Sequence, residues 1–272
     1  MKKIIASLLI LFQFSAPAFA ISSTRKTPAV EVVQDWGPSV VNISTERVAL
    51  LRNQSFWGNY GSAYDQMYED YSNQHPGYKA VTMKNIGSGV IIRKEGVIVT
   101  NAHVINMASK IFVRFSNGKS AEGKVILENQ KDDLAFVKID PPFELKEIKL
   151  ADPKDVSAGE TVVAIGSPIG LENSVSLGVV SGKGRSFVLP NTDHTFGDLI
   201  QTDASINLGS SGGALLNLDG ELVGVNLAVV TNAQGVAFAV SSGKIAAGLK
   251  IYDAQKNEHL KSGKNAVHVP VH

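Results

Sequence analysis

Residues 209–213 (GSSGG) form the most distinctive local motif in the sequence, and they contain a candidate nucleophile. The segments on either side, 202–206 (TDASI) and 214–216 (ALL), are typical of strands. Clustered glycines adopt positive φ angles readily and let the backbone approach a ligand closely. A serine in such a turn lies beside several N–H groups, which is the arrangement that acyl transfer requires. The alternative is a flexible linker, although a linker does not usually interrupt a run of apolar strands.

A serine is inert without a base, and the sequence offers six histidines for that role. Only His103 follows a strand-like run and abuts an apolar one, within residues 99–105 (VTNAHVI). We therefore take His103 as the candidate general base, with a hydrogen-bonded structural histidine as the alternative. The other five lie in polar stretches: His75, His194, His259, His268 and His272.

The base needs an orienting carboxylate, and Asp133 stands directly before the apolar run 134–139 (LAFVKI). Burying a bare charge is costly, so an acid in this place indicates a paired group. Asp132 is the rival, as a cap or a solvent-exposed residue, and Asp133 could also be a simple turn residue. The order His103, Asp133, Ser211 is the order of the triad in the chymotrypsin fold, whereas two other folds use different orders.

Composition excludes several other functions. The chain of 272 residues has no cysteine, which excludes disulfides, thiolate catalysis and cysteine-ligated metal sites. A formal net charge of +1 gives no electrostatic case for nucleic acid as a partner. His103 has no second histidine at the spacing of an HExxH motif, so we expect neither a metal nor a cofactor.

The first twenty residues have the pattern of a secretory signal peptide. Lys2 and Lys3 precede the apolar run 4–12, and small residues follow up to Ala20, where we expect cleavage. The run is short for a membrane span, and no later run approaches that length. We therefore predict a soluble periplasmic protein without a membrane anchor. A buried N-terminal helix is the alternative.

Short strand-like segments recur at intervals of roughly ten residues, which is typical of a sandwich or barrel. They fall into two blocks of similar size, 21–150 and 151–243, and 244–272 would form a C-terminal helix and tail. We predict an all-β fold of two packed antiparallel β-barrels with short terminal helices, over 30–36 and 242–256. The cleft between the barrels would bring His103 and Asp133 to Ser211. The expected strands are 39–44, 89–92, 97–100, 111–115, 134–139, 161–165, 174–181, 199–202, 215–216, 221–230 and 236–240.

Residues 53–80 form a long polar and aromatic stretch in which no helical or strand period is visible. Loops of this length are usually functional or disordered. A mobile insertion, a subunit contact and a lid over the cleft all remain open as interpretations.

Taken together, residues 30–250 resemble the HtrA/Deg group of trypsin-like serine proteases. The resemblance implies two six-stranded β-barrels, a Ser-His-Asp triad, unfolded or damaged periplasmic proteins as substrates, and a homotrimer. The matching stretches are 87–92 (GSGVII), 100–104 (TNAHV), 133–135 (DLA), 163–170 (VAIGSPIG), 200–207 (IQTDASIN), 209–214 (GSSGGA) and 220–226 (GELVGVN).

The resemblance also implies a role for single residues. Ser211 would be the nucleophile, His103 the general base, and Asp133 the group that orients the imidazole. The backbone N–H groups of Gly209 and Ser211 would form the oxyanion hole. Arg185 resembles the family arginine that helps to set the activation loops.

The specificity pocket is assigned in the same way, with Ser205 at its base. No carboxylate is placed there to pair with a basic side chain, so we expect cleavage after aliphatic residues; Asp203 is the nearest acid. The other pocket residues implied by the resemblance are Ile206, Leu208, Asn226 and Ala228.

The sequence departs from the family pattern in four places. Ser210 replaces an asparagine, Leu208 stands where an arginine is common, and the segment 227–236 is short. The stretch after Val240 is too short for the PDZ domain that family members usually carry.

The sequence therefore predicts a serine endopeptidase. One alternative is a binding module or holdase chaperone with the same fold and an idle triad. A serine esterase of another fold would need its Gly-x-Ser-x-Gly motif between a strand and a helix, and the all-β surroundings of Ser211 argue against it.

Overall fold

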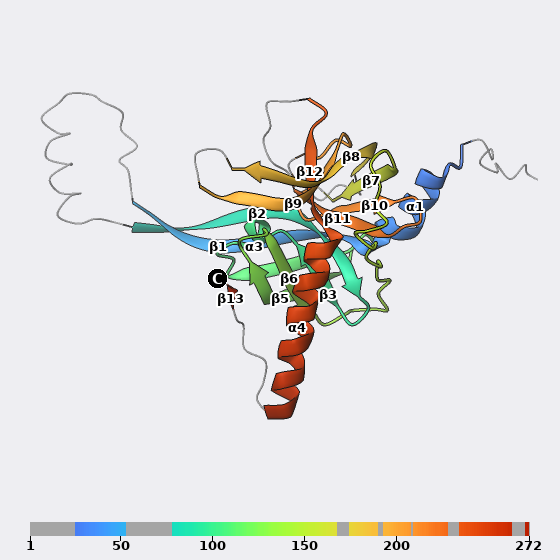
Figure 1. The fold of residues 1–272 in the computed structure, drawn as a ribbon. Coiled ribbons are helices and arrows are strands. Elements are labelled where there is room, and N and C mark those ends of the chain that lie inside the picture. The colour runs from blue at the N-terminus through green and yellow to red at the C-terminus, as the bar shows by residue number, and fades with distance from the viewer. Residues whose placement is uncertain are drawn as a thin grey trace, which may run out of the picture.

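The computed structural model describes residues 25–52, 78–167, 174–189, 193–207, 209–227, 234–262 and 270–271. The predicted signal peptide and residues 53–77 of the long stretch lie outside the described residues. Two β-barrels make up most of the described chain (Figure 1). The prediction of an all-β fold of two six-stranded antiparallel barrels is confirmed.

The first barrel has the strand order β5-β4-β1-β2-β3-β6, and the pairing of β5 with β6 closes it. The short strand β13 (Pro270–Val271) runs parallel to β5 at its outer edge. The barrel strands are β1 (Val40–Arg52), β2 (Tyr78–Arg93), β3 (Val97–Thr100), β4 (Lys110–Arg114), β5 (Ser120–Asn129) and β6 (Leu134–Ile139).

The second barrel is closed in the order β10-β11-β12-β9-β8-β7, and all its neighbours are antiparallel. Its strands are β7 (Thr161–Gly166), β8 (Ser174–Val188), β9 (Thr195–Thr202), β10 (Ala214–Asn217), β11 (Leu222–Leu227) and β12 (Ala237–Ser241).

The core explains why short apolar runs become strands here. β3 and β11 are buried along their whole length, which matches their continuous apolar sequences. One apolar cluster joins the barrels, since it includes Val99 and Phe136 of the first and Ile165 and Val225 of the second. Each barrel also has a cluster of its own. The shared cluster fixes the two barrels against each other.

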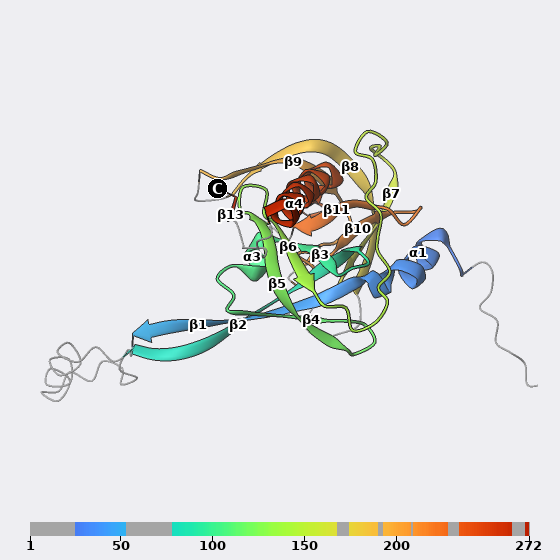
Figure 2. The same ribbon diagram turned by 90° about the horizontal axis from the view of Figure 1, so that it is seen from below.

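Several strands differ in length from their sequence prediction. β1 and β2 form a long hairpin, paired from Val40 with Val90 to Arg52 with Tyr78, that extends well beyond its barrel (Figures 1 and 2). Its backbone pairing continues beyond residues 39–44 and 89–92, the strand segments that the sequence predicted. β5 was not predicted, because exposed charged residues and Gly123 interrupt its pattern.

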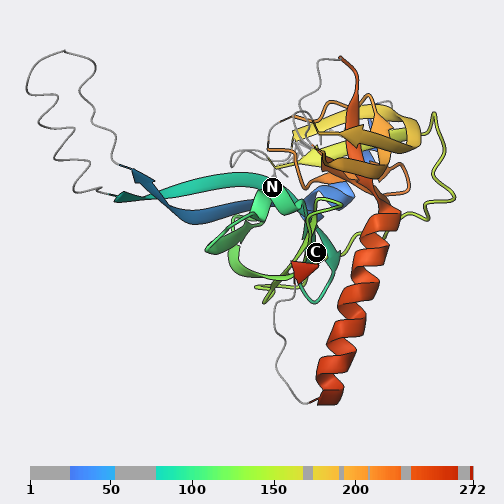
Figure 3. The ribbon, with the colours of Figure 1, turned by 60° about the vertical axis from the view of Figure 1, so that its left-hand side comes forward.

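Both predicted helices form, but the first begins two residues before the predicted range 30–36, and the second is longer than the predicted short helix over 242–256. α1 (Pro28–Trp36) has Pro28 in its first turn and is capped by Thr27, whose hydroxyl accepts the N–H of Val30 at 3.4 Å. It ends at the 3₁₀ turn η1 (Gly37–Ser39). α4 (Ser242–Ser262) starts at the predicted residue but continues past Lys256, projecting from the barrels (Figures 1 and 3). The sequence of residues 257–262 is mostly polar and has no apolar stripe, so it gave no helical signal. Among the described helices, none is long and apolar enough to cross a membrane.

Candidate active site

His103 lies on the one-turn helix α3 (Ala102–Ile105), directly after β3. The side chain of His103 is 45% exposed, whereas that of Asp133 is 6% exposed. The backbone carbonyl of Asp133 accepts hydrogen bonds from the N–H of Ala102 at 3.2 Å and from Nδ2 of Asn101 at 3.0 Å. The start of α3 is therefore fastened to the turn that precedes β6.

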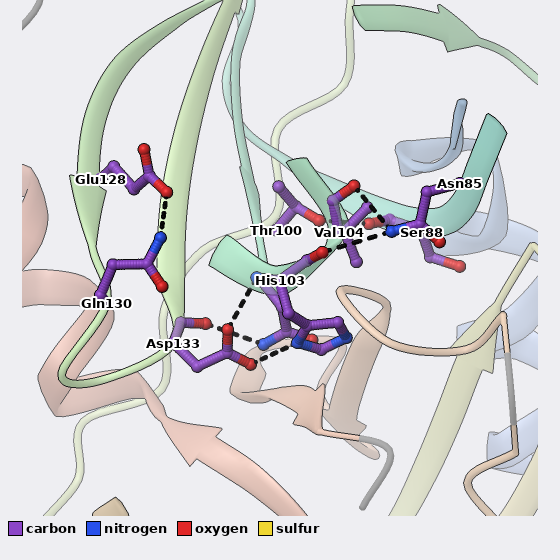
Figure 4. A network of polar contacts seen from close by, with 9 residues as sticks. Asn85, Ser88, Thr100, His103, Val104, Glu128, Gln130 and Asp133 are labelled. Carbon is purple, nitrogen blue, oxygen red and sulfur yellow. Dashed lines mark hydrogen bonds and ion pairs between the residues drawn. The ribbon is translucent and has the colours of Figure 1, made fainter. Parts of the chain in front are cut away.

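The Asp133 carboxylate contacts His103 through both of its oxygens (Figure 4). Oδ2 lies 2.6 Å from Nδ1 of the ring, and Oδ1 accepts the backbone N–H of His103 at 2.9 Å. Asp133 has a φ of 50°, in the left-handed region that non-glycine residues rarely adopt. Strained backbone of this kind clusters at functional sites, where the surrounding structure stabilises it.

Asp132, the rival acid, points to a different partner. One of its oxygens lies 2.8 Å from Nζ of Lys244 on α4, and the other accepts Nδ2 of Asn129 at 2.9 Å. Asp132 therefore ties α4 to the β5–β6 turn, and Asp133 is the acid in contact with the histidine.

The turn at 209–213 is held by backbone hydrogen bonds. Within it, the N–H of Gly213 donates to the carbonyl of Ser210 at 2.9 Å. Asn226 of β11 continues the ladder into the turn, because its carbonyl accepts the N–H of Gly212 and its N–H donates to Gly213, both at 2.9 Å. Gly209 and Gly212 have φ angles of 90° and 83°. As the motif predicted, positive φ angles form this turn.

The N–H groups of Gly209 and Ser211 are the two donors that the sequence analysis assigned to an oxyanion hole. Ser211 is only 6% exposed. Within the described part of the chain, neither the N–H of Gly209 nor that of Ser211 donates a hydrogen bond. An oxyanion hole requires N–H donors that have no other acceptor and whose backbone is held in position by neighbouring hydrogen bonds.

Strand β2 connects the histidine to the serine. Nδ2 of Asn85 donates to the backbone carbonyl of His103 at 3.2 Å, and the N–H of Ser88 donates to the carbonyl of Ser211 at 2.8 Å. Between them, a Cβ on Gly87 would come within 2.7 Å of Val104 and 3.2 Å of the Ser211 carbonyl. Figure 4 shows Asn85, Ser88 and Val104 next to the His103–Asp133 pair. The sequence pattern had assigned no role to Asn85 or Ser88.

Among the described residues, no hydrogen bond joins the His103 ring to the Ser211 hydroxyl. Catalytic hydrogen bonds are often long in ligand-free enzymes and tighten when a substrate binds.

The residues assigned to the specificity pocket have different environments. Ser205 is exposed, and its carbonyl accepts the hydroxyl of Ser176 at 2.8 Å. Ile206 is half-buried and packs on the core of the second barrel. Asn226 is fully buried, and its amide donates to the carbonyls of Ile165 at 3.3 Å and Ala214 at 3.2 Å. Leu208 and Ala228 lie outside the described residues.

Two further residues named in the sequence analysis are Asp203, which contacts strand β8, and Arg185, which lies in it. The Asp203 carboxylate accepts the N–H of Val179 at 2.7 Å, so it is engaged by the strand backbone. The guanidinium of Arg185 lies against Gly182. A Cβ built on Gly182 would be 2.8 Å from Nε of Arg185. Among the described residues, no group of three or more His, Cys, Asp or Glu side chains is placed to hold a metal ion.

Comparison with known families identifies the chain. Residues 87–225, about half of its length, match the model of the trypsin-like peptidase domain. The chain belongs to the trypsin-like peptidase family. The matched residues include His103, Asp133 and Ser211 together with Gly87 and Ser88 of β2.

Curated relatives of the chain are named serine proteases. It is 37% identical over 238 residues to a probable periplasmic serine protease do/HhoA-like of Haemophilus influenzae, covering 85% of this chain and 50% of the relative. It is 34% identical over 226 residues to a putative serine protease HhoA of Synechocystis sp., covering 81% and 55%. The chain thus spans about half the length of the curated relatives it matches.

Solved structures agree with this placement. A variant of the HtrA-type protease AlgW with decapeptide matches with a TM-score of 0.67 and 28% identity, over 87% of this chain and 68% of the other. The unmodified AlgW with decapeptide matches with a TM-score of 0.62, over 83% and 66%. The resemblance to HtrA-type trypsin-like proteases is confirmed.

Proposed function

We propose that this HtrA-type chain is a serine endopeptidase in which Ser211, His103 and Asp133 form the catalytic triad. The observation that carries the proposal is the double contact of Asp133 with His103, beside a glycine-rich turn that presents Ser211. The Asp133 carboxylate accepts a hydrogen bond from the N–H at Nδ1 of His103, which leaves Nε2 of the imidazole as a base.

The reaction follows from this arrangement. Ser211 Oγ attacks the substrate carbonyl carbon while His103 Nε2 takes the hydroxyl proton. The N–H groups of Gly209 and Ser211 stabilise the charge that develops on the carbonyl oxygen. His103 then gives its proton to the leaving amine, and an acyl-enzyme remains on Ser211. Water, activated by the same histidine, hydrolyses the acyl-enzyme and restores the serine.

The substrates are inferred to be unfolded or damaged proteins of the periplasm. AlgW, a relative at 28% identity, has been solved with a decapeptide, which supports extended peptides as the ligand class. Relatives named periplasmic proteases support the compartment, in agreement with the signal-like residues 1–20. We infer a homotrimer by the same resemblance.

The test uses a fluorophosphonate probe together with casein. A protease labels once on Ser211 and degrades denatured casein, and the Ser211→Ala variant does neither. A chain that takes no label and leaves casein intact, yet suppresses aggregation of an unfolded protein, would be a holdase and would overturn the proposal. Mass spectrometry of the cut peptides then gives the sequence preference.

A further inference from the structure

Ser88 of β2 belongs to the first barrel, but its backbone N–H and its hydroxyl both donate to the serine turn of the second. It is fully buried. Its backbone N–H donates to the Ser211 carbonyl at 2.8 Å, and its hydroxyl donates to the Gly209 carbonyl at 2.7 Å. One residue therefore holds the turn at both sides of Ser210.

The hydroxyl of Ser88 also has a third contact. Ser88 Oγ accepts the N–H of Ser167, at the end of β7, at 2.8 Å. The Ser167 carbonyl in turn accepts Nδ2 of the buried Asn42 at 2.8 Å. Because the Ser167 N–H can only donate and the Gly209 carbonyl can only accept, the single hydroxyl proton of Ser88 is directed to Gly209.

The bond to Gly209 acts on the peptide plane between the two oxyanion donors. The peptide that joins Gly209 to Ser210 has its carbonyl bonded to Ser88 and its N–H bonded to the Asn207 carbonyl at 2.9 Å. The N–H groups of Gly209 and Ser211 lie in the peptides on either side of this plane. Fixing the middle peptide at both ends fixes the directions of the two flanking N–H groups. Gly209, with a φ of 90°, would otherwise have wide conformational freedom.

We propose that the Ser88 hydroxyl is a positioning group for the oxyanion hole, holding the Gly209–Ser210 peptide in the orientation that leaves both donors aimed at the substrate. This inference rests on the proposed protease function. Ser88 acts through Gly209 and does not itself contact the substrate.

The test is the Ser88→Ala variant, which removes the hydroxyl and keeps the backbone bond to Ser211. Ser39→Ala is the matched control, because Ser39 is also fully buried and its hydroxyl donates to a backbone carbonyl, that of Lys146, at 2.8 Å. Both variants lose the bond that a buried hydroxyl donates to a backbone carbonyl, but only the Ser88 bond reaches the serine turn. Ser88→Ala also removes the acceptor of the Ser167 N–H. Ser88→Cys keeps a side chain of similar shape with a weak donor and serves as a second variant.

Peptide cleavage is measured as kcat and KM separately, together with the affinity for a peptide boronic acid that ends in an aliphatic residue. Its tetrahedral adduct with the serine places an oxygen in the oxyanion hole, so its affinity reports the hole directly. Losing one oxyanion donor outright costs roughly 100- to 1000-fold in kcat. Misdirecting the donors in Ser88→Ala is expected to cost about tenfold or more, with KM changed by less than about twofold and boronate affinity reduced in parallel. The kcat and the boronate affinity of Ser88→Cys should lie between those of Ser88→Ala and the wild type.

The outcomes separate this inference from the protease function. If the wild type cleaves and Ser88→Ala retains kcat and boronate affinity within about twofold, the inference is wrong while the protease function stands. Equal losses in Ser88→Ala and Ser39→Ala would assign Ser88 a purely structural role and also overturn it. If Ser88→Ala does not fold, an unchanged kcat in folded Ser88→Cys would overturn it. An inactive wild type would overturn the protease function and this inference with it.

Discussion

Asp133 holds His103 at two points, with Oδ2 2.6 Å from Nδ1 of the ring and Oδ1 2.9 Å from the backbone nitrogen. The first contact selects the tautomer that leaves Nε2 as a base, and the second fixes the backbone that carries the ring. The left-handed φ of Asp133 directs its carboxylate to both groups. A single acid therefore sets both the protonation pattern and the position of the candidate base.

Ser211→Ala is expected to abolish proteolysis while leaving the fold intact. The hydroxyl is the attacking atom, and loss of the triad serine costs on the order of a millionfold in kcat in a comparable protease. The backbone bonds that hold the turn do not involve this side chain. Casein turnover measures the loss of proteolysis, and a thermal melt followed by circular dichroism checks that the fold is intact. Cleavage near the wild-type rate would contradict the triad.

Asp133→Asn and Asp132→Asn form a matched pair of neighbouring substitutions. An amide at 133 disturbs the histidine tautomer, and the comparable change in a serine protease lowers kcat about 10⁴-fold. Asp132→Asn affects the contacts with Lys244 and Asn129, neither of which reaches His103, so kcat should stay within a few-fold of wild type. The opposite ranking of the two kcat values would move the triad acid to Asp132.

Cleavage is expected after small or medium aliphatic residues. Ser205, the predicted base of the pocket, offers no charge, and the carboxylate of Asp203 is engaged by the N–H of Val179. An unpaired cation in such a pocket would lose its hydration, whereas an aliphatic side chain would gain about 1.5–3 kcal/mol on burial. Mass spectrometry of peptides cut from a denatured protein identifies the residue before each cut. A majority of Lys or Arg there would point to Asp203 instead.

Gly212→Ala is expected to destabilise the fold and remove activity, with Gly118→Ala as its control. Both glycines have similar φ angles, 83° and 80°, so both substitutions carry backbone strain of roughly 1–2 kcal/mol. A Cβ at 212 would also overlap the Ser88 carbonyl and the Thr100 hydroxyl, whereas the space around Gly118 is open. Thermal unfolding midpoints should therefore fall much further for Gly212→Ala. Equal shifts would mean that the turn can move away from β2.

The arrangement of the fold was readable from the sequence because its signals are local. Apolar runs bounded by turns marked most strands, and Gly37 and Pro38 marked the end of the first helix. The missed strand β5 and the full length of the β1–β2 hairpin had no such local signal. They form through backbone pairing with distant residues, which leaves little trace in the pattern of either strand.

By itself, the sequence determined the chemical groups of the candidate site and their order along the chain. Three local combinations indicated these groups: a hydroxyl among glycines, a histidine after an apolar strand, and an acid before a second apolar strand. Local chemistry strongly restricts each combination. Tertiary structure alone decided that Asp133, and not its neighbour, contacts the histidine, because a φ of 50° turns its carboxylate to His103 while Asp132 faces Lys244. It also decided the place of Ser88, since a buried serine acquires its partners only when two barrels close on each other.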